Sequence, residues 1–177
     1  MIYFTSDEHY YHKNIIDYSN RPFSSLDEMH EVLIQNHNKL VKPADTVYHL
    51  GDFSFDTNIN TVFEHISRLQ GLNIFLKGSH DYWQRDFSRK FKTKFHEILD
   101  IKCGDNYIVL CHYCMLTWPR SHYGSWHLFG HHHGQFTGNV GKSYDVGVDS
   151  NGYKPVSIDE LVEIMKTRPD NINLLKR

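Results

Sequence analysis

Apolar residues recur along the chain in two patterns, one typical of buried strands and one typical of amphipathic helices. Short apolar runs predict strands over residues 2–5, 46–50, 73–76, 95–102, 107–111, 126–129 and 144–148. Apolar positions at helical spacing predict helices over residues 26–40, 59–69, 82–92 and 157–166. Strand and helix alternate in the first half, which favours parallel pairing, whereas consecutive strands dominate the second half. The pattern predicts an α/β fold with two mixed sheets packed together and covered by helices.

Turn and capping residues mark the ends of several of these elements. Ser25 and Glu28 have the spacing of a capping box before the first long helix, and Pro43 ends that helix. Gly71 follows the second helix in the position of a C-cap. Residues 104–106 read Gly-Asp-Asn between two strand patterns, which predicts a hairpin.

Length and composition limit the classes of protein to consider. A chain of 177 residues can bury one sizeable core, so residues 1–177 are predicted to form one domain. Hydrophobic residues make up 40% and charged residues 23%, as in ordinary globular proteins. No apolar stretch is long enough to cross a bilayer, and no basic segment followed by an apolar one begins the chain, so we expect a cytoplasmic protein.

The charge balance gives no general attraction for polyanions. The formal net charge is -2, so no basic field indicates nucleic acid or an anionic membrane as partner. An anionic substrate would need positive charge supplied locally, and bound metal is the obvious source.

Three cysteines do not indicate a disulfide framework. They are Cys103, Cys111 and Cys114, an odd number without a predicted export signal. Cys111 and Cys114 form a C-x-x-C pattern, which fits two small apolar residues near a strand end better than a thioredoxin-like motif. Such a motif would open a helix, and Pro119 disfavours a helix there.

Aspartate and histidine gather where the predicted strands end. The clusters are Asp7-Glu8-His9, Gly51-Asp52, Gly78-Ser79-His80-Asp81, Cys111-His112 and Gly130-His131-His132-His133. Ligands gather at the carboxyl ends of strands in open α/β sheets. Five strand ends that each carry a metal-capable side chain therefore predict a metal site at one edge of the sheets.

The spacing within the clusters suits metal binding. Asp7 and His9 are two residues apart, as are His131 and His133, so each pair can point to one side of an extended segment. Glycine before these clusters lets the chain turn sharply as it leaves a strand. Carboxylates and imidazoles together suit Mn²⁺, Fe and Zn²⁺ better than Mg²⁺ or Ca²⁺. A shared aspartate can bridge two ions, which two-metal phosphoesterases hold roughly 3.5–4 Å apart.

In this order the five motifs resemble those of the calcineurin-like metallophosphoesterases. That family carries D-x-H, G-D, G-N-H-D, a lone histidine after a strand, and G-H-x-H. The match runs from residue 2 to about residue 133, and residues 145–153 also resemble the small bacterial and phage members. The resemblance implies a four-layer α/β/β/α sandwich of two mixed sheets flanked by helices.

The resemblance also implies a role for each motif residue. The first metal ion would be held by Asp7, His9 and His133, with Asp52 bridging to a second ion held by His112 and His131. His80 would contact the substrate phosphate and help to protonate the leaving oxygen, and Asp81 would orient His80. Two divalent ions are expected, with Mn²⁺ favoured and Fe, Zn²⁺ or Ni²⁺ as alternatives.

One residue departs from the family pattern. Ser79 stands where the family has an asparagine whose amide oxygen binds the second metal. A serine hydroxyl is shorter and a poorer neutral ligand, so the second site is predicted to be the weaker one.

The motifs imply hydrolysis of a phosphate ester with metal-bound water as the nucleophile. A phosphodiesterase is favoured, because a doubly charged monoester would call for more cationic groups near the metals than the sequence offers. The substrate would be small and could be nucleotide-like. A phosphomonoesterase and a catalytically weakened scaffold that binds a protein partner are the alternatives. Oligomeric state is left open.

Other residues near the motifs carry further expectations, and some of them have two alternative interpretations. His132 is expected to point away from the metals, and His49 fits a core position as well as a supporting one. His12 and Asn14 could lie near the mouth of the site. Arg21 could meet a phosphate or form a structural ion pair. Aromatic residues before the histidine cluster could stack on a nucleobase or pack within their loop; they are Trp118, Tyr123 and Trp126.

Overall fold

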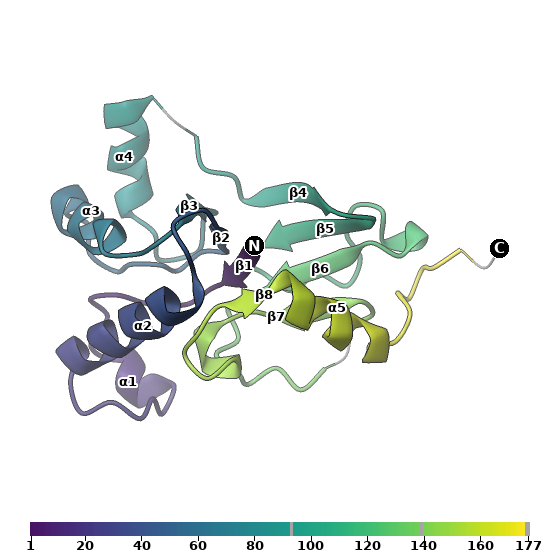
Figure 1. Ribbon diagram of the computed structural model, residues 1–177, viewed down its shortest axis with the longest axis horizontal. Coiled ribbons are helices and arrows are strands. Elements are labelled where there is room, and N and C mark those ends of the chain that lie inside the picture. The colour runs from purple at the N-terminus through teal and green to yellow at the C-terminus, as the bar shows by residue number, and fades with distance from the viewer. Residues whose placement is uncertain (93, 139, 176–177) are drawn as a thin grey trace.

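Two four-stranded sheets form the centre of the computed structural model, which describes residues 1–92, 94–138 and 140–175 (Figure 1). The first sheet has the order β3-β2-β1-β8, with strands β1 (Ile2–Thr5), β2 (Thr46–His49), β3 (Leu72–Phe75) and β8 (Val156–Ser157). The second has the order β4-β5-β6-β7, with strands β4 (Ile98–Cys103), β5 (Asn106–Cys111), β6 (Trp126–Phe129) and β7 (Ser143–Asp145).

Both sheets are mixed, as predicted. Strands β1, β2 and β3 run parallel and β8 is antiparallel to β1. In the second sheet β5, β6 and β7 run parallel and β4 pairs antiparallel with β5 through the predicted hairpin. The two mixed sheets flanked by helices confirm the predicted fold class.

Helices cover the first sheet and close the core between the sheets. They are α1 (Ile15–Tyr18), α2 (Leu26–Leu40), α3 (Ile59–Ser67), α4 (Trp83–Phe91) and α5 (Ile158–Thr167). Figure 1 shows α1 to α4 gathered on one side of the molecule, with the second sheet and α5 on the other. Within the described residues, no helix combines the length and apolar composition that a membrane crossing requires.

Two apolar clusters hold these layers together. One lies between the sheets and joins Phe4 of β1 to Leu110 of β5 and Leu128 of β6, with Leu161 of α5 packed on the same cluster. The other fills the space between the first sheet and helices α1 to α4; its largest buried side chain is Trp83. Burial of this apolar area is the main force that fixes the sheets against each other.

The outer face of the second sheet is covered by a loop. His127 of β6 accepts a hydrogen bond from the Met115 amide at 3.2 Å, and its ring lies 5.2 Å from that of Trp118. Trp118 is buried and its Nε1 donates to the Ser125 carbonyl at 3.1 Å, so this tryptophan packs within its loop. The loop also includes a 3-10 turn over Ser121–Tyr123.

The ends of the helices follow from local capping. Ser25 and Ser157 are the N-caps of α2 and α5, and each side chain accepts a hydrogen bond from the amide of the glutamate three residues later. Glu160 completes a capping box with Ser157, whereas Glu28 bonds to Ser24 instead of Ser25. The sequence pattern missed α1 and β8, because four and two residues are too few to show a periodicity. Cys111 and Cys114 are free thiols.

Candidate metal centre

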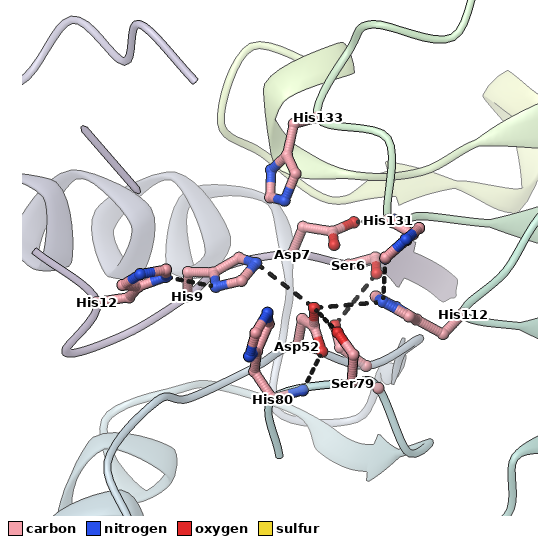
Figure 2. Close-up of polar contacts among 12 residues, drawn as sticks. Ser6, Asp7, His9, His12, Asp52, Ser79, His80, His112, His131 and His133 are labelled. Carbon is pink, nitrogen blue, oxygen red and sulfur yellow. Dashed lines mark hydrogen bonds and ion pairs between the residues drawn. The ribbon is translucent and has the colours of Figure 1, made fainter. Parts of the chain in front are cut away.

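The motif residues converge because the strands that precede them are parallel. Strands β1, β2 and β3 therefore end at one edge of the first sheet, and β5 and β6 end together in the second. The loops that follow also bond to each other: the Asp7 amide donates to the Gly51 carbonyl at 3.1 Å, and the Gly130 amide donates to the His112 carbonyl at 3.0 Å. Figure 2 shows the predicted ligand residues meeting where these loops join.

Asp7, His9 and His133 form the first group of metal-capable side chains. One donor atom from each lies within 4.8 Å of the other two. Asp7 and His9 are almost fully buried, and among the described residues Asp7 Oδ1 and His9 Nε2 have no hydrogen-bond partner. Buried polar atoms are costly when unpaired, so these two atoms fit direct contact with a bound ion.

Asp52, His112 and His131 form the second group, also with donor atoms within 4.8 Å of one another. His112 Nδ1 lies 3.1 Å from the Leu50 carbonyl oxygen, to which it can donate. That hydrogen bond leaves His112 Nε2 free to act as a ligand, and this nitrogen lies 3.2 Å from His131 Nδ1. The second group therefore presents imidazole nitrogens toward one point.

Asp52 links the two groups. Its Oδ2 lies 3.6 Å from His9 Nε2 and 3.3 Å from His112 Nε2, and Figure 2 shows it between these rings. The Ser79 hydroxyl donates to the same oxygen at 2.9 Å, and the His80 amide donates to Oδ1 at 2.8 Å. One carboxylate thus lies against both groups and positions Ser79 and His80 in the loop after β3.

The electrostatics of the groups favour a bound cation. Burial raises the pKa of Asp7 to about 7, and burial lowers the pKa of His9 to about 2. A nearby cation stabilises a buried carboxylate, and a neutral imidazole is the form that binds metal. The mixture of carboxylates and imidazoles is the donor set expected for Mn²⁺, Fe or Zn²⁺.

Five of the predicted ligand residues have left-handed backbone conformations. The φ angles are 62° at Asp7, 54° at His9, 54° at Asp52, 73° at His131 and 48° at His133. Non-glycine residues rarely adopt positive φ, and such residues cluster at functional sites. Hence these five predicted ligand residues lie in strained loops that follow strands.

Gly78 and Gly130 are needed because side chains of other residues approach them closely, and not because the chain turns sharply there. A Cβ on Gly78 would overlap the amide and Oδ1 of Asp52, and a Cβ on Gly130 would overlap Asp7 Oδ2 and Ser6 Oγ. Neither glycine has a positive φ, whereas Gly51 does, at 105°. The turn expected from glycine therefore holds at Gly51, and at the other two positions the missing side chain leaves space for a ligand carboxylate.

Asp149 supports the first group and was not predicted from the motifs. Its Oδ2 lies 2.8 Å from His133 Nδ1, which can donate to it. Buried Arg21 grips the same carboxylate with two bonds of 2.8 Å and donates to the backbone carbonyls of Asp7 and Glu8. Arg21 therefore forms a structural ion pair with Asp149, which is the second of its two interpretations. A carboxylate behind a ligand histidine fixes the orientation of its ring.

Asp81 does not orient His80, contrary to its expected role. Its Oδ2 accepts hydrogen bonds from the amides of Asp52 and Gly78, and its Oδ1 accepts from the Phe53 amide and Trp83 Nε1. His80 Nδ1 has no hydrogen-bond partner within the described ranges. The buried carboxylate is occupied by backbone donors, so Asp81 instead joins the loop of Asp52 to the loop after β3.

Other residues that the sequence singled out lie either beside the two donor groups or away from them. His12 lies beside the site, with its Nδ1 3.1 Å from His9 Nδ1 and its ring stacked on Phe55. His132 turns back to the Gly130 carbonyl, as expected of a residue that points away. His49 is buried against the helices, where its Nδ1 lies 2.6 Å from Glu8 Oε1. Asn14 is an exposed residue at the start of α1.

Comparison with known proteins gives relatives that cover nearly the whole chain. No model of a known protein family matches the sequence. The uncharacterized protein MJ1445 of Methanocaldococcus jannaschii is 34% identical over 172 residues, which cover 93% of this chain and 91% of that protein. A protein of unknown function from Aquifex aeolicus, AQ665, has a crystal structure that superposes with a TM-score of 0.68 at 26% identity, over 93% of this chain and 98% of that one.

Two further solved structures are less similar to this chain. A predicted phosphoesterase from Streptococcus pneumoniae superposes with a TM-score of 0.45 at 17% identity, over 82% of this chain and 70% of that one. A variant of Vps29 from Entamoeba histolytica superposes with a TM-score of 0.47 at 19% identity, over 82% of this chain and 72% of that one.

Two mixed sheets carry two groups of metal-capable side chains near the carboxyl ends of their strands, which is the arrangement that the resemblance to the calcineurin-like metallophosphoesterases implied. At 34% identity over 93% of the chain, the protein belongs to the same family as MJ1445.

Proposed function

We propose that this protein hydrolyses phosphate esters, with diesters as the favoured class, at a centre of two divalent metal ions. The observation that carries the proposal is the position of Asp52 Oδ2, 3.6 Å from His9 Nε2 and 3.3 Å from His112 Nε2. A carboxylate placed between two groups of imidazoles is suited to bridging two ions.

The donor set divides unequally between the two ions. The first would be held by Asp7, His9, Asp52 and His133. The second would share Asp52 and use His112 and His131, with Ser79 as its weak fourth donor. When bound, such ions polarise phosphoryl oxygens and lower the pKa of a coordinated water, and Mn²⁺ is our first choice.

His80 is the proposed acid for the leaving oxygen. Its amide is held by Asp52 Oδ1 at 2.8 Å, and its ring centroid lies 5.6 Å from that of His9. The backbone of His80 is therefore held at Asp52, which places the residue beside the first group. His80 Nδ1 is buried and has no hydrogen-bond partner in the described part of the chain, so the proposed donor to the leaving oxygen is the other ring nitrogen, Nε2.

A diester is favoured because the donor groups themselves contain only carboxylates, imidazoles and a hydroxyl. Arg21, the nearest buried cation, is held by Asp149 and by backbone carbonyls. A doubly charged monoester would gain from a free cation at the scissile phosphate. The alternatives are a phosphomonoesterase and a weakened enzyme that serves as a scaffold.

The function is tested by comparing two chromogenic esters, bis(p-nitrophenyl) phosphate and p-nitrophenyl phosphate, with Mn²⁺ added and with chelator. We expect Mn²⁺-dependent release of p-nitrophenolate, faster from the diester. Faster release from the monoester would support the phosphomonoesterase instead. If neither ester releases p-nitrophenolate in a metal-dependent way, the weakened scaffold is the remaining alternative.

Replacing Ser79 by asparagine is expected to strengthen the second metal site and raise turnover. The Ser79 hydroxyl lies beside the shared carboxylate, and an asparagine amide oxygen would reach further toward the second ion and bind it better than a neutral hydroxyl. Metal titration by calorimetry and the rate with the aryl diester would measure both effects. Ser67→Asn, at an exposed serine of α3, is the matched control. Unchanged stoichiometry and rate would show that Ser79 does not limit the site.

A further inference from the structure

A pocket opens directly beside the second donor group. It has a volume of about 720 Å³ and lies between the loop after β3, helix α4 and the loop after β5. Ser79 lines it, and the hydroxyl of Ser79 donates to Asp52 Oδ2 (Figure 2). Tyr113 forms another wall, with its ring centroid 4.8 Å from that of His131 and 5.0 Å from that of His112. A group attached to a phosphate at the metal centre could therefore extend into this pocket.

The pocket carries three cationic side chains: Lys77, Arg85 and Lys94. Lys77 pairs with exposed Glu97 at 2.9 Å, and among the carboxylates of the described residues Arg85 approaches only Asp86, at 3.6 Å. Lys94 has no ion pair within the described residues. The carboxylate of Asp81, which also lines the pocket, is buried and already accepts several hydrogen bonds. Hence Arg85 and Lys94 leave positive charge available to an anionic ligand.

Aromatic rings line the same space. Tyr82 and Tyr113 are 57% and 48% exposed, and Phe95 contributes a third ring. Exposed aromatic rings next to cations are the combination that binds a base by stacking and a phosphate by charge. The volume is also in the range of pockets for small ligands, roughly 300–1,000 Å³.

We propose that this pocket binds the nucleoside and a further phosphate of a nucleotide substrate whose scissile phosphodiester lies at the metal centre. The proposal rests on the proposed function for placing the scissile phosphate at the metal centre. Its test measures binding and does not require hydrolysis. Arg85 and Lys94 would bind the second phosphate, and the tyrosine rings would stack on the base. The substrate class is thus a phosphodiester of a nucleotide that carries another phosphate group.

The test measures binding of thymidine 3′,5′-bisphosphate to the Mn²⁺-loaded protein by calorimetry, with inorganic phosphate as the reference. Inorganic phosphate reports the metal centre alone. We expect the bisphosphate to bind roughly tenfold tighter or more, since stacking of one base commonly contributes that much. The double variant R85Q/K94Q should lose most of this excess. The matched control R89Q/K90Q removes one arginine and one lysine just outside the pocket, and it should keep the excess.

Two results would overturn the inference. One is a bisphosphate that binds no tighter than inorganic phosphate, and the other is an equal loss of binding in R89Q/K90Q. Hydrolysis of bis(p-nitrophenyl) phosphate, measured in parallel, separates this inference from the proposed function. Turnover without excess binding rejects the nucleotide pocket alone, whereas excess binding without turnover rejects the hydrolase and keeps the pocket.

Discussion

Replacing Asp52 by asparagine is expected to abolish Mn²⁺-dependent hydrolysis of an aryl phosphodiester, with kcat/KM lowered roughly 10³-fold or more. Loss of a residue that only supports a metal ligand commonly costs 10–100-fold. Asp52 would be a direct ligand of both ions, because its Oδ2 lies between His9 and His112. The amide keeps the shape of the carboxylate and removes its charge. Steady-state rates and metal content after gel filtration would measure both losses.

The matched control for this substitution is Asp105→Asn. Asp105 is exposed in the hairpin between β4 and β5, so the change in net charge is the same without contact to the site. A thermal melt of each variant would show that it folds. An Asp52→Asn protein that keeps two ions and most of its rate would contradict the shared-ligand assignment.

Replacing His80 by glutamine is expected to slow hydrolysis of a diester with a poor leaving group by about 10²–10⁴-fold, which is the usual contribution of a general acid. The effect should be much smaller for bis(p-nitrophenyl) phosphate, because p-nitrophenolate leaves without protonation. A dinucleotide such as thymidylyl-thymidine supplies the poor leaving group. The ratio of the two losses is the informative measurement, since both substrates share the same metal centre.

His96→Gln is the control for this second variant. His96 is exposed on the chain before β4, and its backbone carbonyl accepts a hydrogen bond from the Lys77 amide. Equal losses with both substrates in His80→Gln would argue that His80 binds the phosphate instead of protonating the leaving oxygen.

The sequence predicted the strand ends well because each buried strand is a local apolar run that stops at an Asp or His motif. Parallel pairing brings those ends together within each sheet, which places Asp7 near Asp52 and His112 near His131. The division of the ligands between two ions was implied by the resemblance to the calcineurin-like metallophosphoesterases, and the two groups of donor atoms have the same membership. The strand ends were predicted from periodicity and topology, whereas the assignment of ligands to each ion depended on the resemblance.

The supporting contacts could not be predicted in this way. Arg21 and Asp149 are 128 residues apart, and their pairing depends on the fold bringing two loops together. Asp81 follows His80 in sequence, which suggested a contact, but the turn after β3 sends its carboxylate toward the backbone amides of Asp52 and Phe53. Adjacent residues in a turn commonly point to opposite sides, and the motif alone did not reveal which side each would take.

The left-handed backbone at five of the proposed ligands has an evolutionary consequence. A non-glycine residue in that conformation costs of order 1 kcal/mol or more, so the ligand loops store strain that bound ions would offset. A descendant of this chain that stopped using metal would gain stability from glycine at Asp7, His9 or His133. Drift away from the ligand set would then be favoured by folding as well as by disuse.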